Sequence, residues 1–238
     1  MHGVTVKRAQ NDIHKVLFDL DGTLADTAPD LASALNALRA EQGSPPLALE
    51  AIRCRVSEGS RALLQLAFGE DHSEAVFESL RRRFLEIYST HLTRDTRLFP
   101  GIAEVLDALE QERMRWGIVT NKPAWLTGPL IEALGLARRA ACVVSGDTTA
   151  NRKPHPEPLL HAACLSGCQP THCLYVGDAK CDIEAGRAAG MATLVALFGY
   201  IDPADDPGQW GADASISHPD EILHWLDLPG NLRASYGY

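Results

Sequence analysis

The stretch Lys15-Val16-Leu17-Phe18-Asp19-Leu20-Asp21-Gly22-Thr23-Leu24 decides the fold of this chain. Its apolar residues form the short run that is typical of a strand buried on both faces. Asp19 stands at the end of that run and Asp21 follows two residues later, although a buried carboxylate needs a partner or a function. Ligands of open α/β sheets bind at the carboxyl ends of strands. Two acids there indicate a site for a hard cation and an electrophile such as phosphorus. A plain strand followed by an Asp-Gly turn remains the alternative.

The composition limits the size of the fold and the class of partner. The chain has 238 residues, of which 45% are hydrophobic, enough for one large domain or for one domain with a smaller insert. The formal net charge is −9, and there is no basic tail. These charges argue against nucleic acid and against an anionic membrane surface as partners. An anionic substrate must therefore be bound by local cations or by a metal ion.

The sequence shows no targeting or membrane-spanning pattern. Residues 1–14 are polar and lack the apolar core of a signal peptide, and no apolar run approaches membrane-spanning length. The six cysteines form no Cys-x-x-Cys pair and no zinc-type spacing with the nine histidines. We therefore expect reduced thiols and a cytoplasmic location.

A helical pattern occupies residues 25–98. Thr27-Ala28-Pro29-Asp30 is typical of a helix start, with Thr27 as the capping hydroxyl. Apolar residues at helical spacing predict further helices around 49–56, 60–68 and 73–91, and no strand-like alternation appears. We interpret residues 25–98 as an all-helical insert of small-domain size, which divides the rest of the chain into 1–24 and 99–238. The basic run Arg81-Arg82-Arg83 is either an anion-binding patch or a solvated helix face.

Strand and helix patterns alternate after residue 98. This order predicts an α/β fold, in which a parallel sheet is covered by helices on both faces. The expected strands cover residues 116–120, 142–145, 173–177, 193–197 and 214–216, and the expected helices cover 102–111, 126–134, 159–164, 183–189 and 219–226.

Polar side chains lie beside several of these buried runs. Because the carboxyl ends of parallel strands meet at one edge of a sheet, we expect these side chains to join the two acids of the first strand. One hydroxyl, one lysine and several acids would then form a phosphate and magnesium site. Two of the acids are four residues apart, which places them on one side of a helical turn. The residues are Thr120 and Asn121, Lys153, and Asp178 with Asp182.

These residues resemble the four motifs of the haloacid dehalogenase-like hydrolases. The order and spacing are similar over nearly the whole chain. The resemblance implies a Rossmann-like three-layer core, and it implies that the helical insert is the mobile cap of the type-one subgroup. The matching residues are Asp19-Leu20-Asp21-Gly22-Thr23, Thr120 with Asn121, Lys153, and Gly177-Asp178 through Asp182.

The resemblance also implies a role for each catalytic residue. Asp19 would be the nucleophile that forms an aspartyl-phosphate. The Asp21 side chain would protonate the leaving alkoxide and then deprotonate the hydrolytic water. Thr120 and Lys153 would hold the transferring oxygens.

A magnesium ion is the cofactor that the resemblance implies. Its protein ligands would be the Asp19 carboxylate, the Asp21 backbone carbonyl and Asp178, since Mg²⁺ prefers oxygen ligands. Asp182 would orient the metal-bound waters or the lysine rather than bind the metal. Asn121 and Gly22 would lie beside the phosphate or support the residues that hold it. No role is implied for Cys181.

Other reactions of the family fit these residues less well. A dehalogenase needs no metal and no acid at position 21, so Asp21 argues against it. A phosphonate-cleaving relative needs a cap lysine, but no lysine occurs between Lys15 and Lys122. A sugar-phosphate mutase stays open because it shares the second acid, and a binding protein without turnover would be expected to have lost some of the acids. The prediction is a magnesium-dependent phosphomonoesterase.

The cap and the tail carry the evidence on the substrate. The loop Ser57-Glu58-Gly59-Ser60-Arg61 interrupts the helices and would face the active site. Arg61 either pairs with a substrate carboxylate or is solvated, and Lys122 has the same two interpretations. The Thr120–Pro123 segment resembles phosphoglycolate phosphatases. The tail 198–213 and the Ala28-Pro29-Asp30 helix start are more similar to the N-acetylmuramic acid 6-phosphate phosphatases of peptidoglycan recycling.

We therefore expect a small phosphorylated substrate that bears a carboxylate. N-acetylmuramic acid 6-phosphate is favoured over phosphoglycolate, and a broad sugar-phosphate phosphatase is a further alternative. The tail can also be interpreted as a surface loop with Trp210 packed over the core. The sequence leaves a monomer and a dimer equally open.

Overall fold

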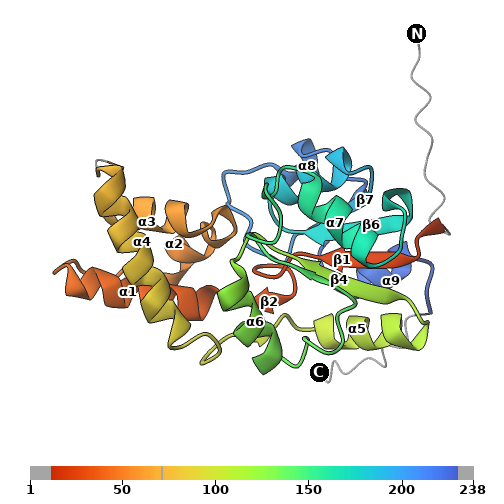
Figure 1. Ribbon diagram of the computed structural model, residues 1–238, viewed down its shortest axis with the longest axis horizontal. Helices are drawn as coiled ribbons and strands as arrows, with labels where there is room; N and C mark the ends of the chain where they lie inside the picture. The colour runs from red at the N-terminus through yellow and green to blue at the C-terminus, as the bar shows by residue number, and fades with distance from the viewer. Residues whose placement is uncertain (1–11, 71, 230–238) are drawn as a thin grey trace, which may run out of the picture.

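The computed structural model describes residues 12–70 and 72–229 of the chain. The expectation for residues 1–14 and the outer ends of the predicted segments 1–24 and 99–238 therefore fall partly outside the described residues. Figure 1 shows two parts, a sheet covered by helices and a group of helices, α1 to α4, beyond one end of the sheet. Within the described residues, no helix is both long and apolar enough to cross a membrane.

The sheet has six strands in the order β5-β4-β1-β6-β7-β8, and every neighbouring pair is parallel. This confirms the predicted parallel sheet, and each predicted strand is found within one or two residues of its expected bounds. The strands are β1 (Lys15–Phe18), β4 (Arg115–Val119), β5 (Val143–Val144), β6 (Cys173–Gly177), β7 (Ala192–Ala196) and β8 (Ala214–Ile216).

Strand β1 lies in the middle of the sheet because its side chains can be buried on both faces. Val16, Leu17 and Phe18 are fully buried, and each such side chain contributes about 1.5–3 kcal/mol to folding. Both β4 and β6 pair with β1 along its whole length. The central position brings the residues that follow β1 next to those that follow its two neighbours.

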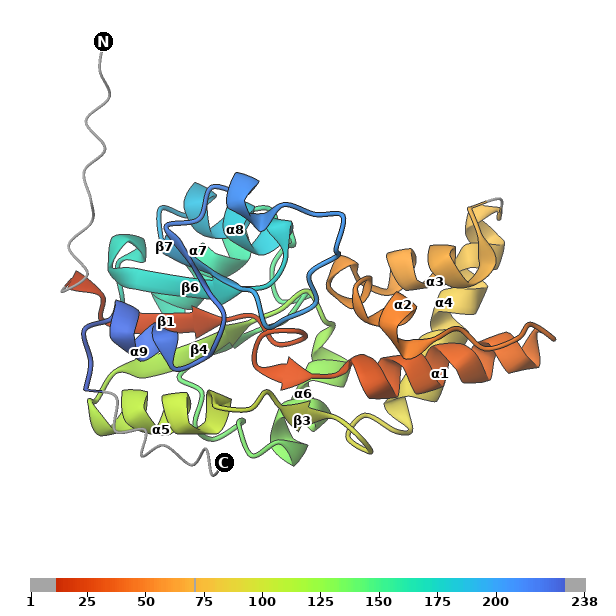
Figure 2. The same cartoon turned by 180° about the vertical axis from the view of Figure 1, so that it is seen from behind.

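Helices cover both faces of the sheet, as the alternating pattern predicted. Figure 2 shows α7 and α8 on one face and α5 and α9 on the other. The chain thus forms the expected three-layer α/β core. The helices of this core are α5 (Ile102–Gln111), α6 (Ala124–Ala133), α7 (Glu157–Leu165), α8 (Lys180–Ala188) and α9 (Glu221–Trp225), with short 3-10 turns at Pro170–His172 and Pro207–Gln209.

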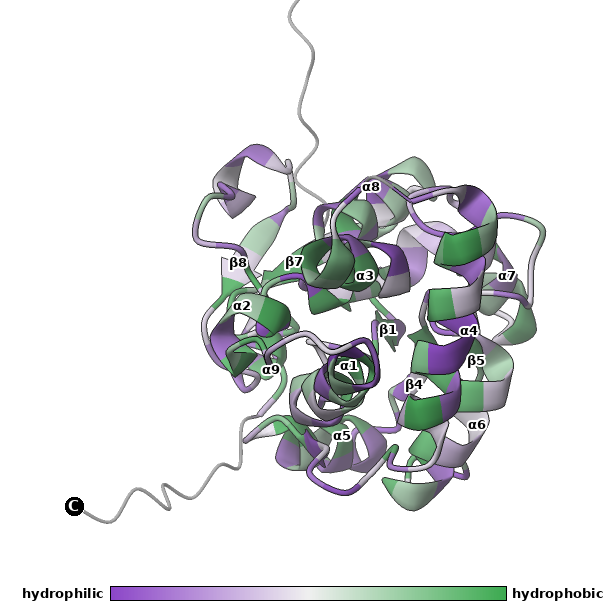
Figure 3. Ribbon diagram, turned by 90° about the vertical axis from the view of Figure 1, so that its left-hand side faces the viewer, coloured by the Kyte–Doolittle hydropathy of each residue, from purple (hydrophilic) through white to green (hydrophobic). Residues whose placement is uncertain are grey.

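The helical insert stands at the carboxyl ends of the strands. Viewed from that side, α1, α3 and α4 surround the end of β1 (Figure 3). Its elements are α1 (Ala28–Glu41), α2 (Leu49–Arg53), a 3-10 turn at Val56–Glu58, α3 (Ser60–Phe68) and α4 (Glu74–Ser89).

Two expectations for this region were wrong. Residues 25–98 are not free of strands, because β2 (Ala25–Asp26) and β3 (Arg97–Leu98) form a two-stranded antiparallel pair. Two residues are too few to show an alternating pattern. Thr27 occupies the N-cap position of α1, but its side chain makes no cap hydrogen bond; the hydroxyl donates instead to Asp21. The domain boundaries at residues 24 and 98 stay a prediction, with the β2–β3 pair lying across them.

Asp30 ties the return of the insert to its start. This carboxylate is 1% exposed and accepts hydrogen bonds from the backbone N–H groups of Asp95 and Thr96 and from the Thr96 hydroxyl, at 2.7–3.1 Å. Three donors at one buried carboxylate compensate for its loss of hydration. The two chain segments that connect the insert to the core are thereby held together.

Asp30→Ala is expected to destabilise the protein by about 2–4 kcal/mol, because it leaves buried donors without acceptors. Urea unfolding measures this difference. The control is Asp107→Ala, since Asp107 is 60% exposed and paired with Arg139 on the surface, where the loss should stay below about 1 kcal/mol. Equal effects of the two substitutions would show that Asp30 does not hold the insert.

Candidate active site

Asp19 and Lys153 form a buried ion pair at the carboxyl end of β1. The Lys153 ammonium lies 2.7 Å from an Asp19 oxygen and 2.8 Å from an Asp182 oxygen. It also donates to the Val119 carbonyl and to the Tyr175 hydroxyl. Burial lowers the pKa of Lys153, but the carboxylates of Asp182 and Asp19 outweigh it, so the pKa is raised and the lysine stays charged. The predicted nucleophile is therefore fixed by a permanent cation.

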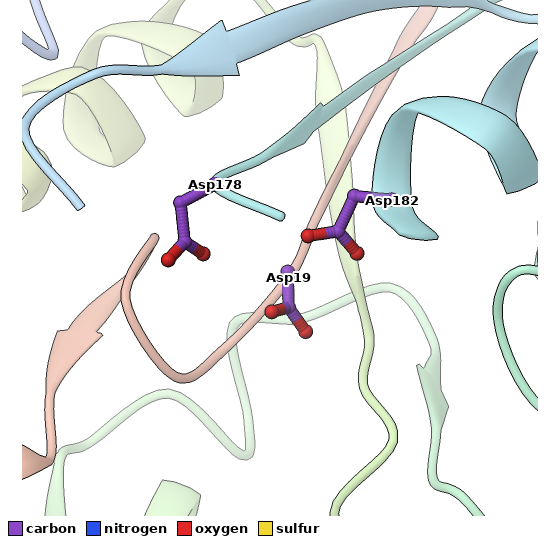
Figure 4. Close-up of side chains that lie close together, drawn as sticks. All are labelled: Asp19, Asp178 and Asp182. Carbon is purple, nitrogen blue, oxygen red and sulfur yellow. The ribbon is translucent and has the colours of Figure 1, made fainter. Parts of the chain in front are cut away.

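Three carboxylates surround this point, from the ends of β1 and β6 and from the first turn of α8. Asp19, Asp178 and Asp182 are all buried, and each offers an oxygen within 4.8 Å of the others; Figure 4 shows the three side chains close together at the ends of the strands. Burial and the neighbouring acids raise the pKa of Asp19, against the opposing effect of Lys153. Burial and Asp182 raise the pKa of Asp178 from 3.8 to about 6. The cluster holds more negative charge than one lysine balances, so it can hold a metal ion.

Asp178 is fixed by donors from three separate segments. It accepts from the Thr23 hydroxyl at 2.8 Å, from the Tyr200 backbone N–H at 2.9 Å and from the Ser57 hydroxyl at 2.7 Å. Gly22 lies against it at a φ of +89°, and a Cβ there would come 2.2 Å from an Asp178 oxygen. Only glycine fits this position, because it tolerates positive φ and leaves room for the carboxylate.

Asp21 lies outside the acidic triad and has different partners. One of its oxygens accepts from the Thr27 hydroxyl at 2.6 Å and from the Lys122 ammonium at 2.8 Å. Burial lowers the pKa of Lys122, but the Asp21 carboxylate and Tyr88 outweigh it, so the pKa is raised. The Lys122 ammonium also lies 4.8 Å from the centre of the Tyr88 ring, which belongs to α4. Lys122 is thus already paired with Asp21. The contact of Thr27 with Asp21 was not predicted from the sequence, because Thr27 was interpreted as a helix cap.

Thr120 and Asn121 support the site in different ways. Thr120 is buried, and its oxygen accepts the Lys122 backbone N–H at 3.1 Å, which leaves the hydroxyl hydrogen for another acceptor. The Asn121 amide makes two 3.0 Å hydrogen bonds with the backbone of Lys153. Asn121 therefore positions the lysine, which corresponds to the second of its two predicted roles, support of the residues that hold the phosphate.

A cavity of about 510 Å³ joins these groups to the helical insert. Arg61 lines it, but its side chain is 59% exposed, lies over the Phe77 ring and pairs with Glu74 at 3.3 Å. The core contributes the two predicted catalytic acids, the lysines and Thr120, and the insert contributes both apolar and polar side chains. The cavity-lining residues of the insert include Leu31, Val56, Ser57, Ser60, Arg61, Leu63, Phe77, Glu78, Arg81, Phe84, Leu85 and Tyr88.

Cys181 and Trp210 lie at a neighbouring cavity of about 410 Å³, which also reaches Asp178 and Lys153. Burial raises the pKa of the Cys181 thiol, so it stays protonated and is a poor nucleophile. Trp210 is buried against Ile183 and Val195. These contacts agree with the interpretation of Trp210 as a side chain packed on the core.

The fold and the arrangement of acids at the strand ends define a class of hydrolase. The family model described as haloacid dehalogenase-like hydrolase matches residues 16–196. The chain belongs to this family. Its fold is similar to that of solved structures, among them a predicted phosphoglycolate phosphatase from Haemophilus somnus 129pt. That structure has a TM-score of 0.81 and 28% identity, and the match covers 90% of this chain and 97% of the other.

Two kinds of phosphatase are among the similar proteins. An N-acetylmuramic acid 6-phosphate phosphatase from Pseudomonas aeruginosa is 43% identical over 212 residues, which cover 89% of this chain and 94% of the relative. A phosphoglycolate phosphatase from Xanthomonas campestris pv. campestris is 47% identical over 208 residues, which cover 87% of this chain and 93% of the relative. Identity alone therefore does not separate the two substrates.

A divalent cation is expected to stabilise the folded protein in a pH-dependent way. The pKa of Asp178 is raised from 3.8 to about 6 in the folded state. Between these two pH values, the metal-free folded state keeps a proton on Asp178 that the unfolded state has released. The contribution of Asp178 to the stability of the metal-free protein therefore falls as pH rises from about 4 to about 6. A cation needs the carboxylates deprotonated, so its stabilising effect should be present above about pH 7 and lost below about pH 6.

Thermal unfolding with and without Mg²⁺ measures this effect. At about 100 times Kd the gain is about 2.7 kcal/mol, or about 5–10 °C for a chain of this size. Asp178→Asn should abolish the gain. An equal rise at about pH 7.5 and at about pH 5, or a rise retained in Asp178→Asn, would place the cation elsewhere.

Proposed function

We propose that this protein is a Mg²⁺-dependent phosphomonoesterase that removes the 6-phosphate of N-acetylmuramic acid 6-phosphate through an aspartyl-phosphate. The observation that carries the proposal is the buried Asp19–Lys153 pair, set among acids at the end of a cavity large enough for a sugar. The relatives named as phosphatases support the reaction class.

Asp19 is the nucleophile of the proposed reaction. A carboxylate oxygen attacks phosphorus, a phosphorus–oxygen bond to the sugar breaks, and the phosphoryl group remains on Asp19. Lys153 lies 2.7 Å from that carboxylate, where it orients the attacking group and attracts the phosphoryl oxygens. The free hydrogen of the Thr120 hydroxyl supplies a further donor to those oxygens.

Asp21 moves the proton in both halves of the reaction. It gives a proton to the departing sugar oxygen, and it later takes one from the water that attacks phosphorus and releases phosphate from Asp19. Thr27 and Lys122 both contact the same oxygen of Asp21. These contacts leave the other oxygen to face the leaving group.

Magnesium fits the acidic triad because the triad offers hard carboxylate oxygens that are buried, and because their negative charge exceeds the positive charge of the neighbouring lysine. Asp19, Asp178 and the Asp21 backbone carbonyl would hold the ion, and Asp182 would keep its contact with Lys153. When bound, the ion neutralises charge on the phosphoryl oxygens, which lets a carboxylate approach a phosphate anion. It also offsets the burial that raises the pKa of Asp19.

The shape of the cavity favours a sugar phosphate over a two-carbon substrate. A cavity of about 510 Å³ lies in the range that encloses ligands much larger than phosphoglycolate. The insert lines it with apolar side chains, which suit a sugar ring with an acetamido methyl group, and with polar ones, which can bind hydroxyl groups. Phosphoglycolate and a broader set of sugar phosphates remain the alternative substrates. The six cysteines are all free, which agrees with the proposed cytoplasmic location.

Asp19→Asn is expected to lower kcat by about 10⁴-fold or more, because it removes the nucleophile, and Asp21→Asn by about 10²- to 10⁴-fold. Phosphate release in the presence of Mg²⁺ measures both. Unchanged thermal unfolding shows that the variants are folded, and Asp107→Asn, at an exposed ion pair, is the control. Turnover that survives Asp19→Asn would reject the aspartyl-phosphate.

The substrate assignment is tested by comparing kcat/KM for N-acetylmuramic acid 6-phosphate, phosphoglycolate and glucose 6-phosphate. We expect the first to exceed the others by at least about 10-fold, since a filled pocket contributes one or more kcal/mol per additional contact. Three similar values would indicate a broad phosphatase. A preference for phosphoglycolate would favour the alternative.

A further inference from the structure

One face of α4 forms a wall of the active-site cavity. Its lining residues recur at helical spacing, so they lie along a single face over three turns. The row contains two charged residues, Glu78 and Arg81, and its other members are aromatic or aliphatic. Arg81 is thus the one basic residue of this row, and it lies beside the acidic Glu78. The row comprises Phe77, Glu78, Arg81, Phe84, Leu85 and Tyr88.

The basic run Arg81-Arg82-Arg83 is divided by the fold. Arg83 turns away from the cavity and pairs with Glu41 at 2.6 Å, and Arg82 is exposed and absent from the cavity lining. Arg81 lines the cavity, and its side chain is 30% exposed. Arg82 and Arg83 therefore lie on the solvated face of α4, and only Arg81 lies where it could bind an anion in the cavity.

Three cations of the cavity, Lys153, Lys122 and Arg81, differ in how strongly they are paired with carboxylates of the protein. Lys153 and Lys122 are paired with core carboxylates at 2.7–2.8 Å, and each is less than a tenth exposed. Arg81 donates from Nε to the Ser60 hydroxyl at 3.2 Å, and Nη1 lies 3.3 Å from an oxygen of the half-exposed Glu78. A long, exposed pair of this kind contributes about 0–1 kcal/mol. A ligand carboxylate that binds a guanidinium through two hydrogen bonds can replace it.

The position of Arg81 on the helix sets the length of ligand that it can reach. Tyr88 lies beside Lys122, which contacts Asp21, so it marks the level of the reacting phosphate. Arg81 is seven residues earlier on α4, about 10 Å along the helix axis. The carboxylate of phosphoglycolate is two carbons from its ester oxygen and is too close to the phosphate. In N-acetylmuramic acid 6-phosphate, the sugar ring separates the phosphate from the lactyl carboxylate.

We propose that Arg81 binds the lactyl carboxylate of the sugar phosphate and thereby determines substrate specificity. This inference rests on the proposed function and identifies the residue that binds the substrate carboxylate. It replaces Arg61 as the expected carboxylate partner. Arg61 is twice as exposed as Arg81 at its side chain and lies over Phe77, which is one turn further from Tyr88. Ser60, at the start of α3, fixes the Arg81 guanidinium at the cavity wall.

The experiment measures kcat/KM of the full-length protein for two sugars that differ only in the lactyl ether. These are N-acetylmuramic acid 6-phosphate and N-acetylglucosamine 6-phosphate. Arg81→Met should lower kcat/KM for the first by about 10- to 100-fold, the effect of losing hydrogen bonds to a charged group. The loss should appear mainly in KM. The value for the second sugar should change less than about 2-fold, which also shows that the variant is folded.

Two variants serve as comparisons. Arg82→Met removes an arginine from the same helix outside the cavity and should leave both values unchanged, and Arg81→Lys should restore part of the preference because it keeps the charge. A loss for both sugars in Arg81→Met, or a selective loss in Arg61→Met alone, would overturn the assignment of Arg81. Failure of the proposed function is a different result, in which the wild-type protein prefers phosphoglycolate.

Discussion

The buried ammonium of Lys153 is the group on which the rest of the site depends. It balances Asp19 and Asp182 at 2.7 and 2.8 Å, and without it three carboxylates would have to share a space with little water. Such a charged interior persists only if every partner is fixed. Asn121 fixes the lysine backbone, and Tyr175 fixes its side chain. The negative charge that remains is what makes the cluster suitable for a cation, so the same arrangement accounts for structure and for chemistry.

The helical insert completes the polar network of the core as well as covering it. Ser57 donates to Asp178, and the Tyr88 ring covers the Lys122 ammonium. Tyr88 lines the cavity, its hydroxyl has no hydrogen-bond partner among the described residues, and burial raises its pKa to about 12, so the phenol is neutral. Contacts of this kind make the charges at the strand ends depend on how the insert is placed. The position of the helical insert therefore affects the ion pairs of the core, because an ion pair is stronger when the insert excludes water from it.

The sheet could be predicted from its buried apolar runs, and the cluster of acids at its edge from the carboxylates that follow those runs. An acid such as Asp19 at the end of a buried run has few structural explanations, and the strand order then brings Asp178 to the same edge. The partners of side chains could not be predicted in this way. Thr27 looks like a helix cap, yet its hydroxyl binds Asp21. Asn121 could have been either a phosphate donor or a support for the site, and only the structure shows that its amide holds the Lys153 backbone. Such choices depend on which donors meet in space, and spacing along the chain does not record them.

The same distinction explains why the reaction was easier to infer than the substrate. Bond breaking at phosphorus needs the same acids, lysine and cation for any phosphate ester, so the core carries no information on the leaving group. Recognition depends on the cavity wall, where Arg81 lies about two turns along α4 from Tyr88, the residue beside Lys122. Arg61 and Arg81 are equivalent as residue types, but the exposed fraction of the Arg61 side chain is about twice that of Arg81. The distance of the arginine from the phosphate, rather than the presence of an arginine, distinguishes phosphoglycolate from a substrate whose carboxylate lies further from its phosphate.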